Sequence, residues 1–161
     1  MKTKTRLLDE IQTDNFTLIG IYSSYENYRL AFFLNDLLGW RFERLPMDLD
    51  FQFKDAFVQF PIFKSKYYKD EVDIYLINNL VKKKEEKRVS SGLFDQQIER
   101  TIVYNLLPEL DKLDYLIKIE DEHSRIPLNN MTKKINKADF EATATLIPNK
   151  QLKSKQHLII D

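Results

Sequence analysis

The feature that most constrains the fold is a change of hydrophobic period near the start of the chain. Residues 16–22, Phe-Thr-Leu-Ile-Gly-Ile-Tyr, are apolar on both alternating faces, which is typical of a strand covered on both sides. Apolar residues then recur at helical spacing up to Gly39, a residue suited to a helix C-cap. Ser23 and Glu26 have the spacing of a capping box at the start of this helix.

The same succession returns near the C-terminal end. Residues 114–120 alternate as a strand does, and Pro127 suits the first position of a second amphipathic helix. Residues 140–146 alternate again and end before Pro148, which predicts a last strand. The chain therefore contains two predicted strand-helix-strand units, residues 16–45 and 114–147.

Between these units, the periodicity predicts strands at residues 48–54, 57–63 and 72–78. Their short connections favour antiparallel pairing. The charged run from Lys82 to Gly92 predicts an exposed loop. Residues 96–107 fit both a helical stripe and a strand, and we favour a strand for their C-terminal half.

These elements predict an α+β two-layer sandwich. Its mainly antiparallel, twisted sheet has two helices on one face, and the two strand-helix-strand units flank a β-meander. A chain of 161 residues is the usual size of one domain, which we place at residues 1–147. Residues 148–161 are polar except at their end and predict a poorly ordered tail.

Charge and composition narrow the partners and the location. Lysine plus arginine equals aspartate plus glutamate at 25 each, so no net field attracts nucleic acid or anionic lipid. Cysteine is absent, which excludes disulfides and cysteine-ligated metals. The first ten residues contain no apolar run of signal-peptide length, and no later stretch is long enough for a membrane helix. We expect a cytoplasmic protein.

No cofactor or metal is predicted. The three glycines are isolated from one another, so the chain contains neither a phosphate-binding loop nor a dinucleotide fingerprint. His123 and His157 have no other ligand at metal-binding spacing, and we assign both to the surface.

Two further groups of residues could carry chemistry. Asp48 and Asp50 lie on one side of a predicted strand, where paired carboxylates can serve acid-base catalysis or bind a divalent cation. We favour the simpler interpretation that they keep an edge strand soluble. Tyrosines among lysines near residues 64–69 suggest base stacking in RNA binding, which the zero net charge disfavours.

Residues 107–115 read Leu107-Pro108-Glu109-x-x-x-Leu113-Asp114-Tyr115. Pro108 excludes a mid-element position, and the residues after it are enough for one helical turn before the next strand. In one interpretation this is a structural corner, where both leucines enter the core, Glu109 caps the turn and Tyr115 packs. In the other, Glu109, Asp114 and Tyr115 form a polar cluster that binds a ligand or partner. We favour the corner.

This motif resembles the signature of the bacterial IPExxxVDY family. Pro108, Glu109, Asp114 and Tyr115 match it, whereas Leu107 and Leu113 replace its isoleucine and valine. The early Leu-Ile-Gly-Ile strand is also similar to the family pattern. The family has no assigned activity, so the resemblance implies no mechanism.

The sequence leaves three functional hypotheses. We favour a non-enzymatic cytosolic binding or protein-interaction module, with a regulatory role as one variant, that takes a protein or small-molecule partner or forms a homo-oligomer through a sheet edge. One alternative is an enzyme acting on a small molecule, in which Glu109 and Asp114, or Asp48 and Asp50, converge with an arginine. The candidate arginines are Arg29, Arg41 and Arg44. The other alternative is an RNA-binding domain.

Overall fold

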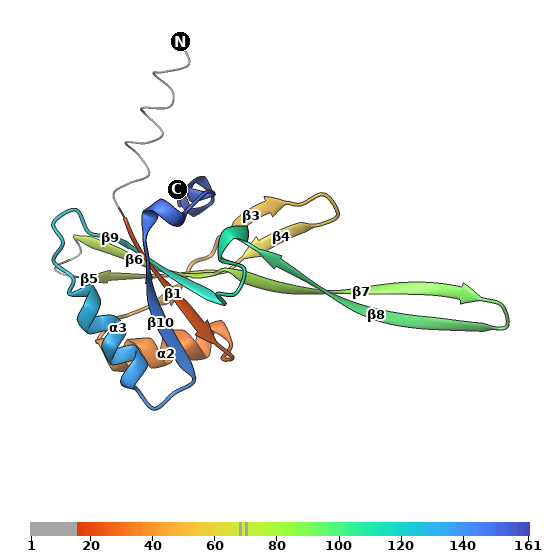
Figure 1. Ribbon diagram of the computed structural model, residues 1–161, viewed down its shortest axis with the longest axis horizontal. Helices are drawn as coiled ribbons and strands as arrows, with labels where there is room; N and C mark the ends of the chain where they lie inside the picture. The colour runs from red at the N-terminus through yellow and green to blue at the C-terminus, as the bar shows by residue number, and fades with distance from the viewer. Residues whose placement is uncertain (1–15, 68, 70) are drawn as a thin grey trace, which may run out of the picture.

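The computed structural model describes residues 16–67, 69 and 71–161. Its centre is a six-stranded sheet of order β10-β1-β9-β6-β5-β2 in which all neighbours are antiparallel. Two further sheets contain two strands each, β3 with β4 and β7 with β8 (Figure 1). The strands are β1 (Thr17–Ser23), β2 (Glu43–Arg44), β3 (Leu49–Gln52), β4 (Phe57–Phe60), β5 (Ile62–Tyr67), β6 (Val72–Asn78), β7 (Leu80–Ser91), β8 (Phe94–Asn105), β9 (Tyr115–Glu120) and β10 (Ala142–Ile147).

Both α-helices, α2 (Asn27–Leu38) and α3 (Leu128–Lys137), lie on one face of the six-stranded sheet (Figure 1). This arrangement confirms the predicted α+β class with a mainly antiparallel sheet. Alternation explains it, because Ile19 and Ile21 of β1 join the core beneath the helices while Leu18 joins a second core on the opposite face.

The second core lies between the sheet and three segments that cross its other face. These are the β3-β4 hairpin, the base of β7 and β8, and the C-terminal residues. Strand β9 serves both sides, since Ile117 and Ile119 contact the helical side and Leu116 contacts the second core. The sheet is therefore covered on both faces, as the two-sided apolar pattern of the first strand predicted.

The sequence predicted the C-terminal end of α2 correctly but not its N-terminal end. Gly39 is the C-cap with a left-handed φ of 67°, as expected. The predicted capping box is wrong, because the helix begins at Asn27 without a side-chain cap. The Ser23 hydroxyl instead accepts a bond from the Tyr25 backbone N–H (3.2 Å) and donates to the Glu141 carbonyl (2.7 Å).

Pro61 divides the strand that was predicted at residues 57–63. A proline has no N–H to donate to a ladder, so pairing stops there and the two halves enter different sheets. β4 pairs with β3, whereas β5 pairs with β6 and β2 in the six-stranded sheet. β5 also continues to Tyr67, into the short connection that was expected after residue 63.

The charged run expected to form a loop is strand β7, so that prediction is wrong. β7 pairs with β8 without a break, from Leu80 opposite Asn105 to Ser91 opposite Phe94. The two strands form an arm that projects from the rest of the protein (Figure 1). The strand favoured for the C-terminal half of residues 96–107 is confirmed.

The C-terminal residues differ from the poorly ordered tail that was expected. They contain two short 3₁₀ helices, η2 (Asn149–Gln151) and η3 (Lys155–Leu158). Leu152 and Leu158 are buried in the second core. Two leucines six residues apart in a polar segment bury enough apolar surface to attach it to the core.

The prediction that the chain lacks a signal peptide rested on its first ten residues. These belong to residues 1–15, which lie outside the described residues. In the part of the chain that the structure describes, no helix combines the length and the apolar character needed to cross a membrane.

Candidate functional site

The motif of residues 107–115 forms the corner between β8 and β9. Pro108 opens a short 3₁₀ helix, η1 (Pro108–Leu110), as the proline predicted. Leu107 and Leu113 are 0% and 3% exposed and belong to the second core. These positions agree with the structural corner that the sequence favoured.

Asn79 holds this corner in place. It lies between β6 and β7, and its side-chain amide donates to the carbonyls of Leu110 and Leu113, each at 2.8 Å. Its side-chain oxygen accepts the Leu107 backbone N–H at 3.0 Å. Asn79 is fully buried. The hydrogen-bonding groups of the motif's backbone are therefore satisfied, away from water, by a side chain some thirty residues away. Sequence reasoning missed Asn79.

Gly20 of β1 makes room for the same corner. A Cβ atom at this position would lie 2.4 Å from Leu113 Cδ1, inside van der Waals contact. Only a residue without a side chain at position 20, in the Leu-Ile-Gly-Ile strand, therefore leaves space for Leu113 of the motif.

Glu109 fixes the C-terminal residues to the corner. Its Oε1 atom accepts the backbone N–H groups of Lys153 and Ser154, both at 2.7 Å. Burial alone would raise the pKa of this carboxyl, but hydrogen bonds from the N–H groups of Glu109, Ser154 and Lys153 lower it below its ordinary value. The acceptor role predicted for Glu109 extends to a distant segment that the sequence did not connect with it.

We expect Glu109→Gln to destabilise the protein at neutral pH by about 1 kcal/mol and to reduce the dependence of its stability on pH. The pKa of Glu109 is lower in the folded state than in the unfolded chain, where a glutamate titrates at about 4.3. The stabilisation is therefore complete above that value and is lost as the pH falls through the folded pKa. Urea unfolding from pH 7 to pH 3 measures it.

In that titration, the stability difference between the natural protein and Glu109→Gln should shrink as the pH falls. Asp111→Asn, an exposed carboxylate in the next turn, is the matched control. A difference that stays constant with pH would contradict the role assigned to the Glu109 carboxylate.

Of the predicted polar cluster, Asp114 and Tyr115 lie close together, whereas Glu109 lies at a different place. Asp114 Oδ2 accepts the Ser23 backbone N–H at 2.9 Å, and the Tyr115 hydroxyl donates to the Tyr25 carbonyl at 2.5 Å. Burial, followed by the nearby Glu26 and Asp114 carboxylates, raises the pKa of Tyr115 to about 12, so the hydroxyl remains a donor. Both residues line a cavity of about 500 Å³ beside the base of β7.

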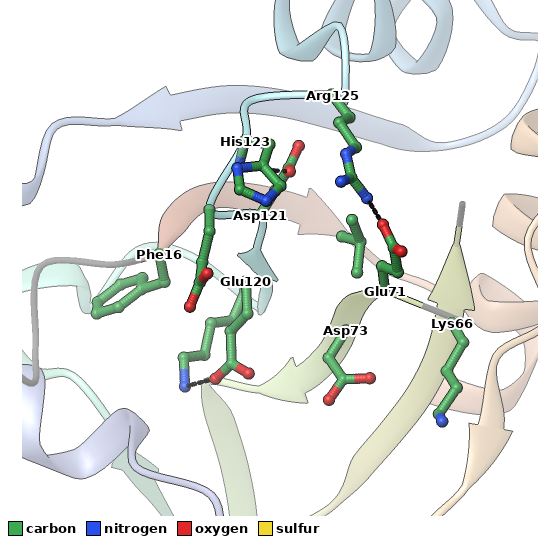
Figure 2. A pocket seen from close by; sticks show the side chains of 11 residues that line it. Phe16, Lys66, Glu71, Asp73, Glu120, Asp121, His123 and Arg125 are labelled. Atoms are coloured by element: carbon green, nitrogen blue, oxygen red, sulfur yellow. Dashed lines mark hydrogen bonds and ion pairs between the residues drawn. The ribbon is translucent and has the colours of Figure 1, made fainter. Parts of the chain in front are cut away.

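A second, larger cavity of about 630 Å³ lies where β6 and β9 meet the loop before α3. Figure 2 shows Arg125 reaching Glu71 on one side of it and Phe16 on the other. Its lining is rich in charge and includes Lys66, Asp73, Asp121 and His123.

The charged groups of this cavity largely satisfy one another. Lys118, whose side chain is 8% exposed, lies 2.6 Å from Glu120 and beneath the rings of Phe16 and Tyr75. Asp73 pairs with Lys64 at 2.9 Å outside the lining. Among the described residues, no group of three histidine, cysteine or carboxylate side chains is placed to hold a metal ion.

The remaining carboxylates proposed for catalysis lie elsewhere and take other partners. Asp48 forms an ion pair with Arg44, and Asp50 accepts a bond from the Gln59 amide at 3.1 Å. Arg29 stacks over the Tyr25 ring, with its guanidinium carbon 4.4 Å from the centroid. The contacts of these residues do not bring a carboxylate pair and an arginine into one cavity.

Of the tyrosines near residues 64–69, Tyr67 is 37% exposed and Tyr68 lies outside the described residues. Tyr75, Tyr104 and Tyr115 are buried, so their faces are not available to stack on bases. His157, which was assigned to the surface, places its Nδ1 atom 2.8 Å from the Leu106 carbonyl and contacts the Phe51 ring.

The arm has two different faces. In an antiparallel pair, residues opposite each other point to the same side, and successive residues alternate. The register therefore places the apolar residues Val81, Val89, Ile98, Ile102 and Tyr104 on one side, which we call the apolar face, although Lys83, Glu85, Lys87 and Arg100 lie on this side as well. The other side, the polar face, carries Lys82, Lys84, Glu86, Arg88, Gln97, Glu99, Thr101 and Val103.

Comparisons with protein-family models, with curated proteins and with solved structures find no match to this chain. The resemblance to the IPExxxVDY family therefore stays a prediction from the motif.

Proposed function

We propose that this protein is a non-enzymatic, cytoplasmic protein-interaction module, that it belongs with the IPExxxVDY proteins, and that the arm is its contact surface. The projecting arm is the observation that carries the proposal. Val89 and Ile98 on its apolar face are 41% and 50% exposed, and Leu93 at its tip is 96% exposed. An isolated two-stranded ribbon is marginally stable in water, so a partner would add what the ribbon lacks.

The apolar face supports this role because it continues the second core. At the base of the arm, Tyr104 is buried, and Val81 and Ile102 pack against the core. Farther out, Val89 and Ile98 occupy the same face without cover from the body. A face that begins as core and ends exposed is suited to extend the core into a partner.

The two outer edges of the arm support the same proposal. In the described residues, β7 and β8 form their ladder with each other alone, so beyond Leu80, whose N–H bonds the Asp114 carbonyl (3.3 Å), each strand presents an open edge of N–H and C=O groups. Such edges bind an added strand through main-chain hydrogen bonds.

The test is site-specific photo-crosslinking in the native cell. A photo-reactive residue at Ile98 should give one discrete adduct whose second component mass spectrometry identifies. The same residue at Lys133, exposed on α3, is the matched control and should give no such adduct.

An arm-shortened variant, with residues 85–100 replaced by Asn-Gly, completes the experiment. We expect it to keep its unfolding temperature and to lose the partner, because the removed residues contact mainly one another. Equal adducts from Ile98 and Lys133, or a shortened variant that retains the partner, would reject the arm as the contact surface.

A further inference from the structure

We propose that the arm's partner is a second copy of this chain, and that β7 of each copy pairs antiparallel with β7 of the other about a two-fold axis at Lys84. This inference rests on the proposed function, and it specifies the partner and the register. The axis stands perpendicular to the arm and joins two hairpins into one four-stranded sheet.

The charges of β7 select this register. An axis at Lys84 places Lys82 opposite Glu86 of the second copy and Lys83 opposite its Glu85. Symmetry repeats both pairs, and the one like-charged contact is Lys84 with itself. Moving the axis one residue, to Glu85, would keep one attractive pair, Lys84 opposite Glu86, but would place Glu85 opposite Glu85, Lys83 opposite Lys87 and Lys82 opposite Arg88, so repulsion would outweigh attraction.

The edge of β8 does not offer the same complementarity. Its outer half carries Glu99 and Arg100 as neighbours, which a two-fold axis at either residue would place opposite themselves. The alternating blocks of lysine and glutamate are confined to β7. We therefore assign the contact to the β7 edge.

A cavity lies at the base of β7, where the Leu80 backbone N–H already bonds the Asp114 carbonyl (3.3 Å). The cavity of about 500 Å³ is lined there by Leu80 and Lys82, with the Glu26 and Asp114 carboxylates on its other side. In the proposed register, Arg88 of the second copy lies opposite Leu80, beside this cavity. Its positive charge would meet the two carboxylates, so shape and charge agree.

The resulting sheet would also relieve the arm's isolation. Residues 81–87 of each β7 would pair, which gives about six to eight hydrogen bonds between the copies, within the range of ordinary interfaces. Because the axis is perpendicular to the sheet, the apolar faces of both arms lie on the same side. Val89 and Ile98 of the two copies then lie on the same side near opposite ends of the sheet, with the charged residues Lys83, Glu85, Lys87 and Arg100 between them.

Charge exchange tests the pairing. The full chain should sediment as a dimer, and Lys82→Glu or Glu86→Lys alone should each weaken dimerisation by about ten-fold or more. Mixing the two variants should restore the dimer as a heterodimer, because each glutamate then faces a lysine. Lys83 is left unchanged because it also donates to the Phe57 carbonyl. Lys133→Glu on α3 is the charge-matched control and should leave the dimer intact.

Engineered thiols test the register, since the chain has no cysteine. Lys84→Cys places two thiols directly opposite at the axis, and oxidation should link the copies. Lys82→Cys places the two thiols about 14 Å apart along the strands, and no link should form. Equal linking by both variants would overturn the register.

If the natural protein sediments as a monomer at concentrations up to about 100 μM, the second-copy proposal is overturned. A specific dimer of this size should have a dissociation constant below that concentration. The proposed function would survive that result if Ile98 still formed an adduct with a different protein. If neither a dimer nor an adduct forms, both proposals fail.

Discussion

Replacing Asn79 with alanine is expected to lower the free energy of unfolding by about 3–5 kcal/mol. Asn79 is fully buried, and its amide satisfies two carbonyls and one N–H of the corner between β8 and β9. Alanine would leave the Leu113 carbonyl and the Leu107 N–H without partners, whereas the Leu110 carbonyl keeps the Leu113 N–H (3.0 Å), and each buried, unsatisfied group costs about 1–3 kcal/mol. The total is a large part of the stability of an ordinary domain.

Urea unfolding followed by circular dichroism measures this loss, with Asn78→Ala as the matched control. Asn78 is the preceding residue, is half-buried, and accepts one side-chain bond, from the Asn27 amide at 3.3 Å. We expect the control to lose less than about 1 kcal/mol. Similar losses in both variants would show that Asn79 does not hold the corner.

Local pattern predicted the elements of the body because they are encoded within short windows. The first strand is apolar on both faces, and Gly39 ends the first helix, so strand and helix could be placed without knowledge of their neighbours. The burial of Leu107 and Leu113 also followed from local chemistry, because a proline-bounded turn directs flanking leucines inward. These parts of the prediction and the structure agree.

The corner's support could not be predicted, because its contacts join residues far apart in the chain. Asn79 is one asparagine at the end of an apolar strand, and a strand end is an ordinary place for that residue. Its role depends on carbonyls at Leu110 and Leu113, which only the folded chain brings near it. The same holds for Glu109, whose partners are Lys153 and Ser154.

The arm was missed for a different physical reason. Strand recognition depends on an apolar residue at every second position, but β7 carries charged residues on both faces from Lys82 to Arg88. Such a segment becomes a strand because β8 supplies its hydrogen bonds and the apolar side chains of the shared face. A charged run followed by a Gly92 turn and an apolar, β-branched segment was the available signal.

Leu158→Ala should cost about 2–4 kcal/mol and should release the C-terminal residues from the second core. Leu158 is 1% exposed, although it belongs to a segment whose polar sequence predicted little order. The decrease in the free energy of unfolding cannot exceed the free energy that attaches the whole C-terminal segment to the second core. Once that contact is gone, the segment can detach and regain conformational entropy.

Ile159 is the matched control, because it is the next residue in the chain and is 53% exposed. Ile159→Ala should change the free energy of unfolding by less than about 0.5 kcal/mol. Amide hydrogen exchange adds a local measurement, since in Leu158→Ala the N–H groups of Lys153 and Ser154, which bind Glu109, should exchange much faster. Equal and small effects of both substitutions would support the poorly ordered tail. A large effect of Leu158 alone would show that two leucines and one carboxylate order a segment whose composition does not predict it.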